Sequence, residues 1–409
     1  MTPGARDDAS HEPIVVSLIV AAAQDEVYGG ERSALAMLGA LNDNGYRVHV
    51  VTNGGPSLQA LAAASGLPVT HVSLKTATAR FRHAGFSDRL RKAYAFVHDW
   101  LLLNRVFTSL GADIVHVNDL SPAGQIGVPA ARMMRAPVVV HVRTEIPLRR
   151  LHRLMLWLAD VSVTVSSGVL DIHMASIRGT AGAKRIARRA VALHNGVDLE
   201  RFEAYGPEAR SAARARLGVN PQAFMVLNVG SFEPRKRQLH LLENVLPRLE
   251  RQGTVVNSYF VGGTKSLHQS YLARCEEARA RLGDPRKCHL VGYTEQIHDY
   301  YTACDAVILG SLIEGLPRTV IEAMACGRAT VAVASPGACE LIEPGRSGYL
   351  IETGDDGREF ARALAGLAAM SDAERDAMGR LGRRRLEVGF DVRTVARRFR
   401  EILDLARRA

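Results

Sequence analysis

The chain has 409 residues, more than one ordinary hydrophobic core accommodates, which predicts two domains of similar size. Apolar residues make up 47% of it and charged residues 23%, a balance typical of a globular protein, and no apolar run approaches the roughly 18 residues of a membrane-spanning helix. The net charge is +10, and residues 1–195 hold most of it, with 21 Lys and Arg against 14 Asp and Glu.

Residues 1–12 are polar and lack the apolar core of a signal peptide, so we expect a cytoplasmic protein. The five cysteines all lie in the second half and match no zinc-binding spacing. They are expected to be reduced thiols that pack as small apolar side chains.

Short apolar segments alternate with helical stretches throughout, the pattern of a doubly wound α/β protein. In the first half, strands are predicted at residues 14–22, 47–52, 69–72, 114–117, 138–142, 161–165 and 190–194. In the second half, they are predicted at residues 223–229, 257–261, 288–291, 306–309 and 330–334, with helices between them, such as 31–42, 88–110 and 238–251. We therefore expect two Rossmann-like domains facing each other across a cleft, with ligands at the carboxyl ends of the strands.

The domain boundary is predicted within residues 194–202, where the last strand of the first half ends in a turn that contains the Asn195-Gly196 dipeptide. This gives a first domain over residues 1–199 and a second over residues 200–388. Residues 389–409 are predicted to form an amphipathic helix that packs back on the first domain.

Two carboxylates flank a predicted helix start in the second domain. Glu314 follows the strand at residues 306–309, and Glu322 lies eight positions later, within the helix that Pro317 begins. A carboxylate in such a setting usually holds a hydroxyl or a cation. The segment therefore indicates a site for an anionic ligand that carries a sugar.

Two other strand-to-helix junctions suit an anion. The Gly29-Gly30 pair would allow close backbone approach at a helix start, although most such pairs only form turns. Arg235, Lys236 and Arg237 follow the strand that ends near Gly230 and could neutralise a diphosphate leaving group, unless they form a solvated loop. The pattern Gly-x-Gly-x-x-Gly is absent here, which argues against a nicotinamide or flavin cofactor.

Polar side chains also end two strands of the first half. Asn118 and Asp119 follow His116, while Arg143 lies two positions after His141 and thus on the same face of its strand, with Glu145 beyond it. These are candidate site residues, although a lone histidine is more often structural.

At these residues the chain resembles glycosyltransferase family 4, the retaining, nucleotide-sugar-dependent enzymes of GT-B fold. The resemblance covers essentially the whole chain. Its most specific motif runs from Glu314 to Gly327, and the Asn195-Gly-Val-Asp198 turn supports it. Other matching segments are Gly29-Gly30, Lys236, Gly262-Gly263 and Pro336-Gly-Ala-Cys-Glu340 with Gly345 and Gly348.

The resemblance implies a hexosyltransferase of cell-surface polysaccharide or glycolipid synthesis that needs no metal ion and no cofactor. Lys236 would bind the diphosphate, Glu314 the donor sugar and Glu322 the ribose hydroxyls. Further donor-binding residues would be Gly30, Arg235, Tyr293, Gly315, Leu316, Pro317, Thr319 and Val320. The acceptor would be a saccharide or a lipid-linked glycan, bound by Asn118, Asp119, His141 and Arg143.

Two positions depart from the family pattern. Ser231 stands where members often have an arginine, for which Arg235 would substitute, and Arg143 stands where many have a histidine. The basic first half would suit a phosphate-rich acceptor or peripheral contact with an anionic inner leaflet. A solvated helix face explains the basic runs equally well. These runs are Arg80, Arg82, Arg89, Arg91 and Lys92, and then Arg149, Arg150 and Arg153. Nucleic acid is disfavoured because aromatic residues are not interleaved with these charges. A sugar-nucleotide epimerase and a non-catalytic subunit are the alternative functions.

Overall fold

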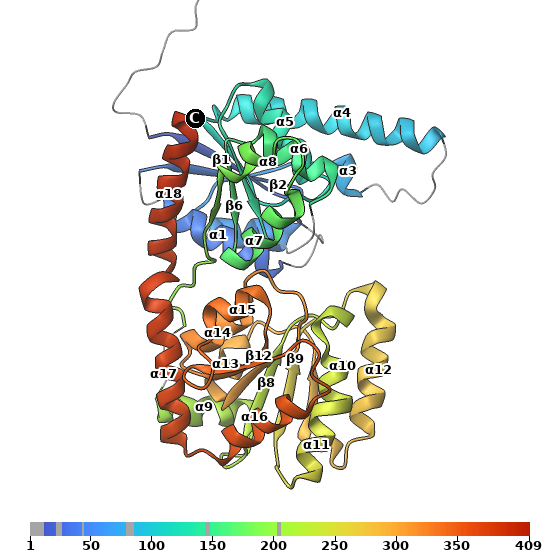
Figure 1. The fold of residues 1–409 in the computed structure, drawn as a ribbon, viewed down its shortest axis with the longest axis vertical. Coiled ribbons are helices and arrows are strands. Elements are labelled where there is room, and N and C mark those ends of the chain that lie inside the picture. The colour runs from blue at the N-terminus through green and yellow to red at the C-terminus, as the bar shows by residue number, and fades with distance from the viewer. Residues whose placement is uncertain (1–11, 22–26, 43–44, 79–85, 144–147, 203–205) are drawn as a thin grey trace, which may run out of the picture. The chain divides into compact units, whose positions relative to one another are not determined.

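The computed structural model describes residues 12–21, 27–42, 45–78, 86–143, 148–202 and 206–409. The chain divides into one unit of residues 1–196 and 392–409 and a second of residues 197–391 (Figure 1). Ala22, Arg80, Arg82 and Glu145, which the sequence places in predicted features, lie outside the described residues.

The first unit is built on a parallel sheet in the order β3-β2-β1-β4-β5-β6-β7. The order reverses direction beside β1, which is the arrangement of a doubly wound fold. Its strands are β1 (Ile14–Ile19), β2 (Arg47–Thr52), β3 (Val69–His71), β4 (Ile114–Val117), β5 (Val138–Val142), β6 (Val161–Thr164) and β7 (Ala190–Ala192).

Helices cover both faces of this sheet. One core contains apolar side chains of α1 (Gly29–Asn42), α2 (Pro56–Ala64) and the last helix, α18 (Val392–Arg408). The other contains those of α4 (Phe86–Ser109), α5 (Gly124–Met133) and α6 (Arg150–Leu158). The remaining helices of the unit are α3 (Lys75–Thr78), α7 (Ser167–Ile177) and α8 (Ala183–Ala187).

The final helix α18 packs within the first unit although it lies at the end of the chain. Val395, Phe399 and Leu403 repeat at helical spacing and are buried. The Tyr46 hydroxyl donates a hydrogen bond to Asp404 Oδ1 at 2.5 Å. The amphipathic pattern thus buries one face of α18 against α1 (Figure 1).

The second unit repeats the architecture with a parallel sheet in the order β10-β9-β8-β11-β12-β13. Its strands are β8 (Met225–Val229), β9 (Asn257–Val261), β10 (Cys288–Val291), β11 (Ala306–Leu309), β12 (Ala329–Val333) and β13 (Gly348–Ile351). Its helices include α9 (Pro207–Leu217), α12 (Gln269–Ala280), α13 (Ile297–Ala303), α14 (Arg318–Ala325), α15 (Pro336–Leu341), α16 (Arg358–Ala369) and α17 (Asp372–Gly389). Both units are Rossmann-like, which confirms the predicted fold class.

Strands β1, β3, β6, β7, β8 and β12 lie where they were predicted but with different bounds, and two other elements depart further from the sequence-based expectation. Strand β13 was not predicted, because it begins at Gly348, directly after a turn; a Cβ there would lie 2.3 Å from the Thr330 carbonyl oxygen. The helix predicted at residues 238–251 consists of α10 (Gln238–His240), a π-helical turn (Leu241–Val245) and α11 (Leu246–Arg251). The wider turn precedes Pro247, which lacks the N–H that a regular helix would use.

Among the described residues, no helix is both long and apolar enough to cross a membrane. Four cysteines are buried, as expected for thiols that pack as apolar side chains, and Cys339 is exposed.

Candidate active site

The second unit brings glycines to its topological switch point, where the direction of strand order reverses between β8 and β11. Gly230 follows β8, and Gly262 follows the neighbouring strand β9. A Cβ on Gly262 would lie 2.1 Å from the Gly230 carbonyl oxygen, so only glycine allows the two strand ends to approach this closely. This edge of the sheet is where open α/β folds bind ligands.

Lys236 and Glu314 meet at this edge from the loops after β8 and β11. Lys236 Nζ lies 2.5 Å from Glu314 Oε1, and the two side chains are 14% and 13% exposed. Partial burial strengthens their attraction relative to that of a surface pair. The two residues that the sequence singled out are therefore in direct contact.

Arg235 brings a second cation to the same carboxylate. Its guanidinium lies 3.8 Å from Glu314 Oε1 and 2.7 Å from Glu233 Oε1. Glu233 also accepts a hydrogen bond from the Ser231 hydroxyl at 3.0 Å, and His268 Nε2 lies 3.8 Å from its other oxygen. Glu233 thus anchors Arg235, a role that the sequence analysis missed.

The loop between β11 and α14 is held in place by contacts with α15 and with the end of β8. A Cβ on Gly337, at the start of α15, would lie 2.2 Å from the Gly315 carbonyl oxygen, so the two backbones are in direct contact. The Thr319 hydroxyl donates to the Val229 carbonyl oxygen at 3.2 Å, which joins α14 to the end of β8. Leu316 and Val320 are buried, and Pro317 is the residue before the first helical position.

Glu322 is held by two residues that the sequence analysis did not identify. The Tyr301 hydroxyl donates to Glu322 Oε2 at 2.9 Å, and Arg318 lies 2.7 Å from Oε1. Burial and the Glu322 charge raise the pKa of Tyr301 well above its usual value, which keeps the hydroxyl a donor. Arg318 was recognisable as the i−4 partner of Glu322, whereas Tyr301 comes from α13, a separate βα unit.

A cavity of about 260 Å³ lies beside this edge, where β9 and β10 end. Gly262, Gly263 and Tyr293 are among the residues that line it, and Tyr293 is 60% exposed. The resemblance assigned Tyr293 to donor binding, and the structure places this residue at a cavity.

Arg143 organises a polar cluster in the first unit. It donates to Asn118 Oδ1 through Nε and to Asn195 Oδ1 through Nη1, each at 2.8 Å. Gly30 adjoins it, since a Cβ there would lie 3.4 Å from Arg143 Cδ. Gly30 therefore lies with the predicted acceptor residues of its own unit, although the sequence assigned it to the donor.

Asp119 lies beside this cluster. Its backbone neighbour Leu120 donates to Oδ1 at 2.7 Å. Burial raises the pKa of Asp119, while the Leu120 N–H and the Arg143 charge oppose that shift.

His116 and His141 lie in the core of the first unit, not at a solvent-exposed strand end. The His116 and His141 ring centroids are 5.7 Å apart, and both rings pack near Phe399 of α18. His116 Nδ1 lies 2.9 Å from the Ser17 hydroxyl, whereas neither ring nitrogen of His141 has a hydrogen-bond partner among the described residues. Burial and the Arg143 charge lower the pKa of His116 to about 3 and that of His141 well below its usual value.

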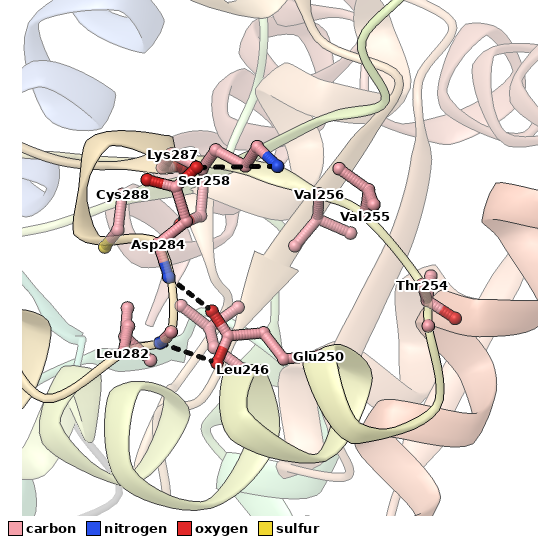
Figure 2. A pocket seen from close by; sticks show the side chains of 12 residues that line it. Leu246, Glu250, Thr254, Val255, Val256, Ser258, Leu282, Asp284, Lys287 and Cys288 are labelled. Carbon is pink, nitrogen blue, oxygen red and sulfur yellow. Dashed lines mark hydrogen bonds and ion pairs between the residues drawn. The ribbon is translucent and has the colours of Figure 1, made fainter.

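A second cavity, of about 250 Å³, lies at the amino-terminal edge of β9 and β10, opposite the switch point (Figure 2). Glu250 lines this cavity, and its carboxylate accepts hydrogen bonds from the backbone N–H groups of Gly283 and Asp284 at 3.1 and 3.3 Å. Lys287 lies 3.6 Å from Asp284. The charged residues that line this cavity are thus already held by hydrogen bonds or ion pairs.

Two family models match the chain, one in each half. The model described as "Glycosyltransferase Family 4" matches residues 27–201, and the model described as "Glycosyl transferases group 1" matches residues 223–370. The matches include the Arg143 cluster of the first unit and the Lys236–Glu314 pair of the second.

Curated relatives match less than half of the chain. A D-inositol 3-phosphate glycosyltransferase of Streptomyces bingchenggensis is 34% identical over 185 residues, or 43% of this chain and 39% of that protein. The putative glycosyltransferase EpsD of Bacillus subtilis is 26% identical over 184 residues, or 45% of this chain and 46% of that protein. The chain thus spans less than half the length of the curated relatives it matches.

Solved structures match nearly the whole chain. Anabaena HepE, in complex with UDP and glucose, has a TM-score of 0.75 at 21% identity and covers 96% of this chain and 99% of its own. A glycosyltransferase from Rickettsia africae has a TM-score of 0.78 at 18% identity, with 97% and 98% coverage. At these identities, the likeness establishes the shared fold.

Proposed function

Because the chain belongs to glycosyltransferase family 4, with the GT-B fold, we propose that it transfers a hexose from a nucleotide-diphosphate sugar to a saccharide or lipid-linked acceptor, with retention of configuration. In this proposal the second unit binds the donor and the first binds the acceptor. The observation that carries it is the convergence of Lys236 and Arg235 on one oxygen of Glu314 at the switch point.

The two cations match the charge that the reaction develops. When the bond between the sugar and the diphosphate breaks, negative charge appears on the departing phosphate oxygen. Lys236 and Arg235 would stabilise that charge, an electrostatic effect that is usually a large part of catalysis. Binding of the diphosphate would draw Lys236 from Glu314, and the released carboxylate could then accept a hydrogen bond from a hydroxyl of the donor sugar.

Retention follows in this proposal from attack on the same face of the sugar as the leaving group. The acceptor hydroxyl forms the new bond to the anomeric carbon, and its proton passes to the departing phosphate oxygen. Lys236 and Arg235 supply the positive charge that a metal ion supplies in other transferases, so no metal is required.

The nucleoside would occupy the rest of the switch-point edge. Glu322, oriented by Tyr301 and Arg318, would accept hydrogen bonds from the ribose hydroxyls, and the cavity beside Tyr293 would take the base. UDP is the first nucleotide to test, since it is bound by the structural relative HepE.

The acceptor would lie at the Arg143 cluster. A guanidinium held by two amide oxygens suits a phosphate group, and the relatives named for D-inositol 3-phosphate point to the same chemistry. A phosphate-bearing polyol and a lipid-linked glycan are both candidates, in the synthesis of a cell-surface polysaccharide or glycolipid.

Two assays test the proposal. Thermal-shift screening against UDP, GDP, ADP and their sugars should show a rise in melting temperature with one nucleotide, by mass action. Transfer to an acceptor should then be abolished in both the Lys236→Ala and the Glu314→Ala protein, with the fold of each left intact. Near-normal turnover in both would reject the assignment. Conversion of the donor to an isomer without an acceptor would instead indicate an epimerase.

A further inference from the structure

Large apolar side chains are exposed along one stripe of α4 in the first unit. Leu90, Tyr94, Val97 and Leu101 are 57%, 61%, 47% and 39% exposed. Their spacing of four, three and four residues places them on a single face of the helix. We call these four residues the α4 stripe.

The opposite face of α4 already forms the core contacts of the helix. Leu103 and Phe107 are fully buried in the core beneath the sheet. Asp99 is buried as well and accepts hydrogen bonds from the backbone N–H groups of Lys75 and Thr76. The α4 stripe is therefore a second apolar face, and Figure 1 shows that the amino-terminal part of α4 extends beyond the sheet.

Helix α6 also has exposed apolar side chains, and it lies on the same side of the sheet as α4, because both helices pack on α5. Its exposed residues are Leu151, Leu154 and Trp157, with the guanidinium of Arg185 lying 5.2 Å from the Trp157 ring centroid. Arg150 begins this helix and is also exposed.

Basic side chains border the α4 stripe. Arg91 and Arg105 are exposed and lie one turn from Tyr94 and Leu101, respectively. Asp88 lies 3.9 Å from Arg91, and Lys75 Nζ donates to the Tyr94 hydroxyl at 2.8 Å. The border of the stripe is thus predominantly positive.

We propose that the α4 stripe rests on an anionic lipid surface, with its apolar side chains at the headgroup boundary and Arg91 and Arg105 at lipid phosphates. An amphipathic helix with a basic border has this affinity. A second copy of the chain fits less well, because a two-fold contact through the stripe would bring like charges together. The proposal rests on the proposed function only in that such a surface would present a lipid-linked acceptor.

Sedimentation with vesicles tests this surface. The full chain should sediment with vesicles of phosphatidylglycerol and phosphatidylcholine and stay in solution with phosphatidylcholine alone. The triple variant Leu90→Ser, Val97→Ser and Leu101→Ser should partition about tenfold less or weaker still. The matched control Leu267→Ser and Val388→Ser, at exposed apolar positions of the second unit, should bind as the unaltered chain does.

A second variant separates the charge from the apolar contribution. Arg91→Gln with Arg105→Gln should weaken binding to the anionic vesicles by about fivefold for each charge removed, and added salt should have the same effect. Failure of the unaltered chain to bind anionic vesicles, or equal binding by the triple variant, would overturn the proposal. So would a dimer in light scattering that the triple variant dissociates.

The outcome is independent of the donor chemistry. The rise in melting temperature with UDP should be the same in the triple variant and the unaltered chain, because the stripe lies outside the donor unit. Vesicle binding without any change in melting temperature on adding nucleotides would reject the proposed function and support the lipid-binding surface. A change in melting temperature with a nucleotide but no vesicle binding would support the proposed function and reject the lipid-binding surface.

Discussion

Lys236 Nζ lies 2.5 Å from Glu314 Oε1, although 78 positions separate the two residues in the chain. Parallel strands β8 and β11 are neighbours, so the loops that follow them meet at one edge. The pair therefore joins the two loops that the proposed donor diphosphate would contact.

Replacing Lys236 should remove transition-state stabilisation without unfolding the protein. Lys236→Ala is expected to lower kcat by about a hundredfold or more, since a charge aimed at the leaving group is lost. Steady-state kinetics measure the effect, and an unchanged melting temperature establishes that the fold is intact. Lys236→Arg keeps the charge and should recover part of the rate; a fully active Lys236→Ala protein would contradict the role.

Arg235 should act as the second cation that Ser231 does not supply. Arg235→Ala is expected to lower kcat, and Glu233→Gln to lower it less, because the neutral amide can still accept a hydrogen bond from Ser231 but loses the ion pair with Arg235. Arg281→Ala, at the exposed residue that directly follows α12, is the matched control. If the kcat values of both active-site variants equalled that of this control, Arg235 would not take the place of the arginine that is missing at Ser231.

Tyr301 should influence nucleotide affinity through Glu322. Tyr301→Phe removes a hydrogen bond to a carboxylate, an interaction that contributes about 1.5–3 kcal/mol, and leaves Glu322 less firmly oriented. Isothermal titration should show weaker UDP binding in this variant. Tyr349→Phe, in β13, serves as the control, and equal affinities in both proteins would show that Glu322 does not depend on Tyr301.

The buried histidines should make stability depend on pH. Their pKa values are lower in the folded state than the ordinary value of 6.5, so the unfolded chain binds more protons below that pH. The free energy of unfolding should fall as the pH falls from about 7 to about 5. His141→Leu should reduce the slope of the free energy of unfolding against pH, measured by urea titrations, by about 1.4 kcal/mol per pH unit. Exposed His71→Gln is the control, and an unchanged slope in the His141 variant would refute this assignment.

Metal removal should leave transfer unaffected, because in the proposed mechanism Lys236 and Arg235 neutralise the negative charge of the diphosphate. Initial rates measured with a chelator and with added Mg²⁺ should agree. Loss of activity with the chelator, restored by the metal, would show that the two side chains are insufficient.

Much of the fold was predictable because buried parallel strands are short, nearly continuous apolar runs. Strands β2, β4, β5, β9, β10 and β11 have the predicted bounds. Sequence gives no such signal for β13, whose first residue is a glycine needed for close approach to β12.

The candidate site was predictable where a motif places residues close together in the chain, as with Arg235, Lys236 and the segment from Glu314 to Glu322. Contacts made by tertiary packing were not. Tyr301 reaches Glu322 from another βα unit. Conversely, His141 lies one residue before the end of β5, close to the predicted strand end, yet Phe399 of α18, from the far end of the chain, packs near its ring.

The contact between Gly337 and the Gly315 backbone has a thermodynamic consequence. A loop supported by its neighbour loses its conformational entropy when the chain folds, so little is left to lose when a ligand arrives. Side chains around Leu316 and Pro317 could thus diverge between related proteins, and in the proposed function change which sugar is accepted, while the backbone path stays the same. By contrast, any side chain larger than hydrogen at position 337 would displace that path from outside the site.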